Sequence, residues 1–115
     1  MSAAIILPQE IGAGKEREVQ TLFADPWRKL VLIRLRKNAK LANHSARVPI
    51  TIQGVLGKGT LGVGEAAYEL SPGVIIPVAA QAEHNVQADP ELAILVTFFR
   101  QPGRETGDET TARFD

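Results

Sequence analysis

The chain of 115 residues has the length of one ordinary domain, and its 13 basic and 13 acidic residues cancel to a net charge of zero. A neutral chain has no overall field that attracts nucleic acid or an anionic membrane, so we expect neither partner. The absence of cysteine excludes disulfides, thiolate metal sites and a cysteine nucleophile, and it fits a reducing compartment. No apolar stretch approaches the roughly 20 residues of a membrane helix, and the start does not look like a signal peptide. We therefore predict a cytoplasmic protein.

The N-terminal part shows two candidate strands. Residues 3–7 form a short apolar run that ends at Pro8, which would suit an additional strand at the edge of a sheet. Residues 15–25 alternate between apolar and polar side chains, and this pattern predicts a second strand.

The alternation is clearest in residues 28–37. Two faces are evident: Val31, Ile33 and Leu35 on one, and Leu32, Arg34 and Arg36 on the other. This pattern predicts a half-buried strand with one face in the core and the other towards solvent or a partner. We expect the basic side chains to be solvated rather than bound to nucleic acid, because no aromatic stacking platform accompanies them.

Glycine, proline and asparagine divide the rest of the chain into short β-rich segments. The expected strands cover residues 41–44, 48–53, 60–63, 66–70, 74–78, 84–88 and 92–99, separated by turns at Asn38, Gly57–Gly59, Gly64-Glu65, Ser71–Gly73 and Asp89-Pro90. Eight or more strands without a helical period predict an all-β barrel or sandwich. We assign residues 29–100 to this barrel and residues 1–28 to N-terminal strands at a sheet edge or dimer contact. Residues 101–115 have a composition typical of a disordered tail.

The spacing of turns and histidines resembles the cupin family, whose fold is a small jelly-roll barrel, also called a double-stranded β-helix. The first cupin motif places a glycine, two histidines, a glutamate and a second glycine at positions that correspond here to Asn38, His44, Ala46, Ile50 and Gly57. The second motif places a histidine eleven residues after a Pro-Gly turn, as His84 follows Pro72-Gly73. The resemblance covers residues 29–99 and implies that His44 and His84 come together inside the barrel.

The same resemblance bears on metal binding. A typical metal-binding cupin holds its ion with three histidines and one glutamate, but Ala46 and Ile50 stand at two of these four positions. The resemblance therefore implies at most a weakly bound Zn, Cu or Ni ion at His44 and His84, and equally no metal at all.

The register of residues 48–54 leaves two alternatives for the pocket. If Ile50 faces the interior, Ile52 does so as well, and the histidines lie in an apolar interior. A bulge earlier in the strand would instead turn Thr51 and Gln53 inward, and similar small cupins with Thr-x-Gln at this point favour this register. The predicted ligand-binding residues are then His44, Thr51, Gln53 and His84.

Two functions fit these residues. The first is a module that binds or senses a small molecule in a pocket formed by His44 and His84. The alternative is a metal-dependent or metal-assisted enzyme, of isomerase or dioxygenase type, that acts on a small carbonyl compound or organic acid. We also predict a homodimer, because Leu30 and Leu32 on the second face of their strand and the apolar residues 3–7 need a partner sheet.

Overall fold

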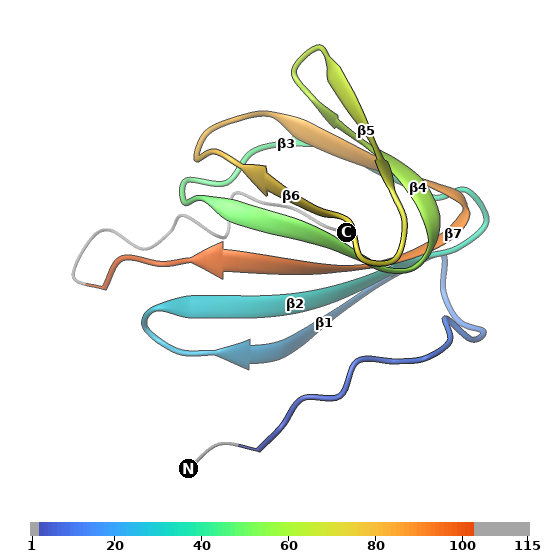
Figure 1. Ribbon diagram of the computed structural model, residues 1–115, viewed down its shortest axis with the longest axis horizontal. Coiled ribbons are helices and arrows are strands. Elements are labelled where there is room, and N and C mark those ends of the chain that lie inside the picture. Colours follow the sequence, from blue (N-terminus) through green and yellow to red (C-terminus); the bar gives the residue numbers. More distant parts are fainter. Residues whose placement is uncertain (1–2, 103–115) are drawn as a thin grey trace.

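Seven β-strands make up the computed structural model, which describes residues 3–102 (Figure 1). The strands are β1 Arg17–Ala24, β2 Arg28–Leu35, β3 Lys40–His44, β4 Ile50–Val63, β5 Ala66–Leu70, β6 Ile75–Val78 and β7 His84–Phe99. They form one antiparallel sheet in the order β1-β2-β7-β4-β5, with β3 paired to β7 and β6 paired to β4. The predicted all-β class is confirmed. Among the described residues there is no helix long and apolar enough to cross a membrane.

The strands β4 and β7 are long and pass through both halves of a rolled sheet (Figure 1). The first half also contains β1, β2 and β6, and the second half also contains β3 and β5. The sequence had suggested two shorter strands in place of each, with turns at Gly57–Gly59 and Asp89-Pro90, and this prediction is wrong. The chain bends there without reversing, because the register between β4 and β7 shifts twice around Gly57. Gly57 has a φ of +75°, and a Cβ at this position would overlap the carbonyl oxygen of Glu91. Glycine is therefore what lets the two strands bend together.

Two other turns occur where the sequence predicted them. Asn38 has a φ of +59° in the connection between β2 and β3. This agrees with the prediction, because asparagine is the residue other than glycine that best tolerates a positive φ. Gly64 has a φ of +58° in the tight hairpin between β4 and β5. The domain boundaries predicted from the sequence stay a prediction, and residues 103–115 of the expected disordered tail lie outside the described residues.

The apolar core lies between the two halves of the roll. The inward positions of β2 are Val31, Ile33 and Leu35, each at most 2% exposed, as the alternation predicted. Ile50 and Ile52 of β4 pair with inward residues of β7 and are also buried in this core. The inner face of the first half of the roll is therefore buried in an aliphatic core. Such packing supplies most of the stabilisation of a small domain.

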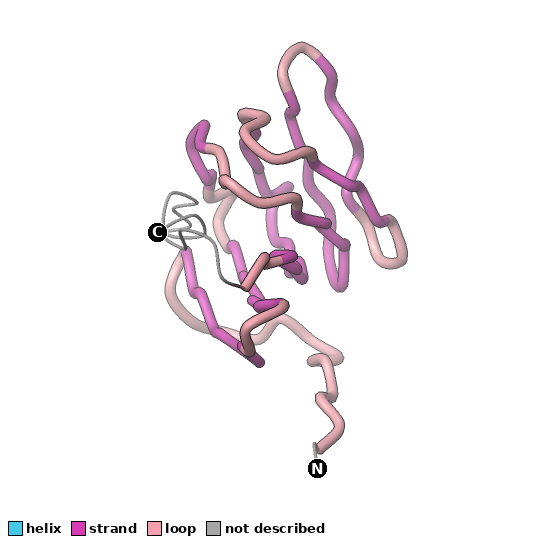
Figure 2. Tube along the Cα trace, turned by 90° about the vertical axis from the view of Figure 1, so that its left-hand side faces the viewer, coloured by secondary structure: helices cyan, strands magenta, loops and turns pink. Residues whose placement is uncertain are grey.

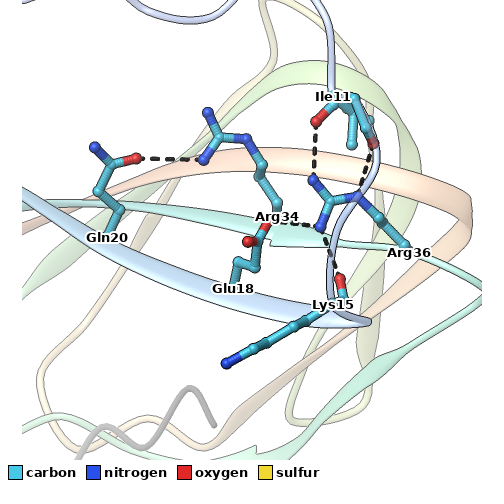
Figure 3. A network of polar contacts seen from close by, with 7 residues as sticks. Ile11, Lys15, Glu18, Gln20, Arg34 and Arg36 are labelled. Carbon is cyan, nitrogen blue, oxygen red and sulfur yellow. Dashed lines mark hydrogen bonds and ion pairs between the residues drawn. The ribbon is translucent and has the colours of Figure 1, made fainter.

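Arg36, which directly follows β2, is not solvated, in contrast to the prediction. The guanidinium of Arg36 is held by an N-terminal loop (Figure 3). Arg36 Nε donates to the carbonyl oxygen of Gly12 (2.8 Å), Nη2 to that of Ile11 (2.9 Å), and Nη1 to that of Lys15 (2.7 Å) and to Glu18 Oε1 (2.6 Å). Arg36 is only 4% exposed. A buried guanidinium needs several acceptors, and the loop together with Glu18 of β1 provides them.

Residues 3–10, which we call the N-terminal arm, form no strand, so the edge strand predicted at residues 3–7 is absent. In both views the arm runs outside the strands (Figure 1 and Figure 2). A strand needs a neighbouring backbone as partner, and apolar composition alone does not provide one.

Candidate functional site

The two histidines of the chain lie next to each other. His44 ends β3, His84 begins β7, and the two are direct partners in the strand register. Their ring centroids are 4.3 Å apart, with the ring planes at 63°. His84 is 1% exposed and His44 is half-buried. The two histidines, forty positions apart in the sequence, therefore lie together as predicted. They are neighbours on adjacent strands, however, and do not meet across the barrel as expected.

Backbone carbonyls orient both rings. Nδ1 of His44 donates to the carbonyl oxygen of Ala42 (2.7 Å), and Nδ1 of His84 donates to that of Ala82 (3.0 Å). Because a carbonyl oxygen only accepts, each Nδ1 carries a proton, and Nε2 of the neutral ring keeps its lone pair. Nε2 of His84 is buried and has no hydrogen-bond partner within residues 3–102. The site therefore presents a buried acceptor.

The charge state of His84 follows from its surroundings. Burial lowers the pKa of His84 below its ordinary value of 6.5, and the nearby His44 lowers it further, while the hydrogen bond to Ala82 acts in the opposite direction. His84 is consequently neutral at pH 7. The acceptor character of Nε2 is thus maintained under ordinary conditions.

An asparagine stands beside each histidine, a feature whose role the sequence analysis missed. Asn43 precedes His44 and Asn85 follows His84, so both amides lie on the outside of the strand pair, where Nδ2 of Asn85 donates to Oδ1 of Asn43 (2.8 Å). This bond ties β3 to β7 at the level of the histidines. On the inside, Val63 of β4 is the strand partner of His84. The matching Asn-His and His-Asn pairs are the signal from which the contact could have been predicted.

Thr51 and Gln53 do not join the histidines, so the favoured register was wrong. Their neighbours Ile50 and Ile52 are 2% and 0% exposed within the core. Side chains alternate along a strand, so Thr51 and Gln53 point to the outer face. The physical reason is that inward placement of the isoleucines buries more apolar surface than inward placement of an amide and a hydroxyl. The apolar alternative, also considered from the sequence, is the one that forms.

The residues present do not fit the four-ligand ion site of typical metal-binding cupins. Ala46 and Ile50 stand at two ligand positions, and both are buried apolar residues without a donor atom in their side chains. Nowhere in residues 3–102 do three or more His, Cys, Asp or Glu residues group together in a way that could hold a metal ion. Two imidazoles alone give a weak site, because affinity depends on the number and type of ligands.

No protein-family model and no curated protein matches the chain. Its fold is nevertheless similar to that of solved structures. A conserved protein of unknown function from Streptococcus pyogenes has a TM-score of 0.75 at 17% identity, with 90% of this chain and 93% of that chain covered. An RmlC-like cupin from Shewanella frigidimarina has a TM-score of 0.70 at 22% identity, with 82% and 83% covered.

A third similar structure is an enzyme, salicylate 1,2-dioxygenase from Pseudoaminobacter salicylatoxidans. It has a TM-score of 0.69 at 15% identity, and the match covers 73% of this chain and 25% of that chain. The chain therefore has the cupin fold, as its resemblance to the cupin family implied. Because this fold carries enzymes as well as proteins of unknown function, it does not by itself define an activity.

Proposed function

We propose that the protein binds a small organic molecule inside its cupin barrel, at the pair formed by His44 and His84. The observation that carries the proposal is the buried Nε2 of His84, which has no hydrogen-bond partner in the described part of the chain. A buried polar atom left in this state costs about 1–3 kcal/mol. A ligand that donates a hydrogen bond to Nε2 would recover this energy, and the interior of a small barrel is a common place for such a ligand.

The chemistry of the site favours a neutral ligand with a donor group. Nε2 of His84 can only accept, so it suits a hydroxyl, amine or amide N–H, whereas an ionised carboxylate has no proton to offer. The inward positions nearest to His84 on β4 and β7 are Val63, Leu61 and Val86, which favour an apolar ligand body. Binding of this kind suits a module that senses or carries a metabolite.

A thermal-shift screen tests this proposal. The panel contains small alcohols, phenols and amides together with carboxylates of similar size. We expect some neutral donors to stabilise the wild-type chain, by about 2.7 kcal/mol at a hundred times the Kd. The stabilisation should disappear in His84→Leu and persist in the matched control Gln53→Leu, whose side chain lies on the outer face. A panel without any response, or a response that does not depend on His84, would contradict the proposal.

The alternative function is a metal-assisted enzyme, and one observation favours it. Both histidines donate Nδ1–H to a backbone carbonyl, which is the arrangement that orients metal-ligating histidines. Elemental analysis of protein purified without chelator distinguishes the two functions. Near-stoichiometric Zn, Cu or Ni that is lost in His84→Ala would support the enzyme and argue against the metal-free binding site. The cytoplasmic location and the homodimer expected from the sequence also stay proposals.

A further inference from the structure

Tyr68 of β5 lies on the inner face of the sheet, although much of its side chain is exposed. Strand partners share a face, and the register places Tyr68 at the end of one row of partners: Leu41, Val86, Leu61 and Tyr68. The other three members are each at most 1% exposed and belong to the apolar core, whereas Tyr68 is 45% exposed. The row therefore begins in the core and ends in an aromatic ring that solvent reaches.

The alternation along β5 agrees with this orientation. Leu70, two residues after Tyr68 and thus on the same face, is 0% exposed in the core, while the intervening Glu69 points to the outer face. β5 ends the order of the sheet, and β4 is its one strand partner within residues 3–102. In both views the hairpin of β4 and β5 projects beyond the other strands (Figure 1 and Figure 2). Tyr68 is thus exposed because it lies at the edge of the sheet, and not because it points outward.

The neighbouring inner row contains the histidine pair. Its members are His44, His84, Val63 and Ala66. Val63 is the direct partner of His84 and the diagonal neighbour of Tyr68, and diagonal neighbours are about 7–8 Å apart, within reach of an aromatic side chain. Val63 is only half-buried. It therefore forms an apolar floor with His84 on one side and Tyr68 on the other.

We propose that Tyr68 contacts the ligand of the histidine site and selects flat aromatic molecules that carry a hydrogen-bond donor, such as phenols. The inference deepens the proposed function and rests on it. The ligand hydroxyl donates to Nε2 of His84, which is buried and without a hydrogen-bond partner in the described chain. The ligand ring lies over Val63 and meets the ring of Tyr68. Aromatic rings attract each other in edge-to-face or offset arrangements, a contact that a saturated ring does not make.

The two inner rows also define the charge of the ligand. Neither row contains an Asp, Glu, Lys or Arg residue. An ionised ligand would lose its hydration here without gaining a charged partner, which is costly. A phenol has a pKa near 10, as the tyrosine side chain does, and is neutral at pH 7. The site therefore favours a phenol over an aromatic carboxylate.

A titration with phenol and with cyclohexanol, followed by NMR of the histidine ring signals, tests the selection. Both probes have a six-membered ring and one hydroxyl, but only phenol is aromatic. Phenol is also the stronger donor, so the decisive quantity is the change in the ratio of the two Kd values between variants. Tyr68→Leu should reduce the preference for phenol roughly two- to tenfold, and Tyr68→Phe should keep it. The matched control is Phe99→Leu, which removes an aromatic side chain of the same 45% exposure at the opposite end of β7 from His84, and should leave the ratio unchanged.

The contact itself can be observed in the wild-type chain. Tyr68 is the one tyrosine of the sequence, so selective labelling of tyrosine gives the signals of this ring alone. Deuterated phenol should shift these signals through its ring current, and cyclohexanol, which has no ring current, should shift them much less. This measurement does not depend on the folding of any variant.

The outcomes separate the inference from the proposed function. Binding of both probes that is lost in His84→Leu, combined with unmoved Tyr68 signals or with a ratio that Tyr68→Leu does not change, would overturn the role of Tyr68 and leave the histidine site standing. If neither probe binds, or if binding is the same in His84→Leu, the proposed function fails and the inference fails with it.

Discussion

Replacing His84 by leucine should leave the protein as stable as before or make it more stable, which is unusual for a fully buried residue. The change removes the buried Nε2 that has no partner within residues 3–102, and with it a cost of about 1–3 kcal/mol. It also removes the hydrogen bond from Nδ1 to the carbonyl of Ala82, which contributes about 1 kcal/mol. Leucine fills a similar volume. We expect the free energy of unfolding to rise by about 0–2 kcal/mol.

Urea unfolding followed by circular dichroism measures this difference, at a pH well above 6.5 and without added ligand. The control is Leu61→Ala, a truncation of a side chain with 0% exposure, which should lose about 2–5 kcal/mol in the same assay. If His84→Leu instead loses more than about 1 kcal/mol, Nε2 of His84 is satisfied in solution, and the argument for a ligand at this atom fails.

The pH dependence of stability provides an independent check on the same residue. The pKa of His84 is lower in the folded protein than its ordinary value of 6.5, mainly because of burial. The unfolded chain therefore binds the proton more tightly, and the wild-type protein loses stability as the pH falls from 6.5 towards the folded pKa, by at most about 1.4 kcal/mol per pH unit. His84→Leu should lack this loss. An identical pH profile for both proteins would refute the assignment of a lowered pKa.

Two further variants test the bend and the anchored loop by urea unfolding. Gly57→Ala should lower the free energy of unfolding by more than about 2 kcal/mol, because the positive φ strains alanine and the added Cβ overlaps the carbonyl of Glu91. The control is Gly73→Ala, where φ is also positive but the added Cβ meets open space, and it should lower the free energy of unfolding by about 1 kcal/mol. Equal losses would show that the overlap is relieved. Arg36→Met should lose about 2–3 kcal/mol, because one charged donor serves several carbonyls. Arg34→Met, which breaks a single 3.3 Å bond, should change stability by less than about 0.5 kcal/mol, and a similar loss in both would contradict the role of the loop.

Local features of the chain were sufficient to predict the β class, whereas the cupin fold and the meeting of the histidines were implied by the resemblance to the cupin family. Alternation in β2 identified Val31, Ile33 and Leu35 as inward residues, because a side chain in a strand points to the face opposite its neighbours. The spacing of His44 and His84 carried that resemblance, and the two histidines are indeed strand partners. Turn chemistry, which depends on a few neighbouring residues, was sufficient at Asn38 and Gly64.

Tertiary structure decided which face of β4 is inside and where strands continue. Ile50-Thr51-Ile52-Gln53 alternates equally well in either orientation, and the choice depends on packing against β7, whose partner residues are more than forty positions away. Glycines that resemble a turn in the sequence proved to be a bend within one strand, because pairing with β7 on both sides keeps the chain extended. The burial of Arg36 likewise depends on a loop that only the folded chain brings to it. The alternation of side chains and the turn residues are properties of short stretches of sequence, whereas the face that a strand turns inward is set by the surface on which it packs.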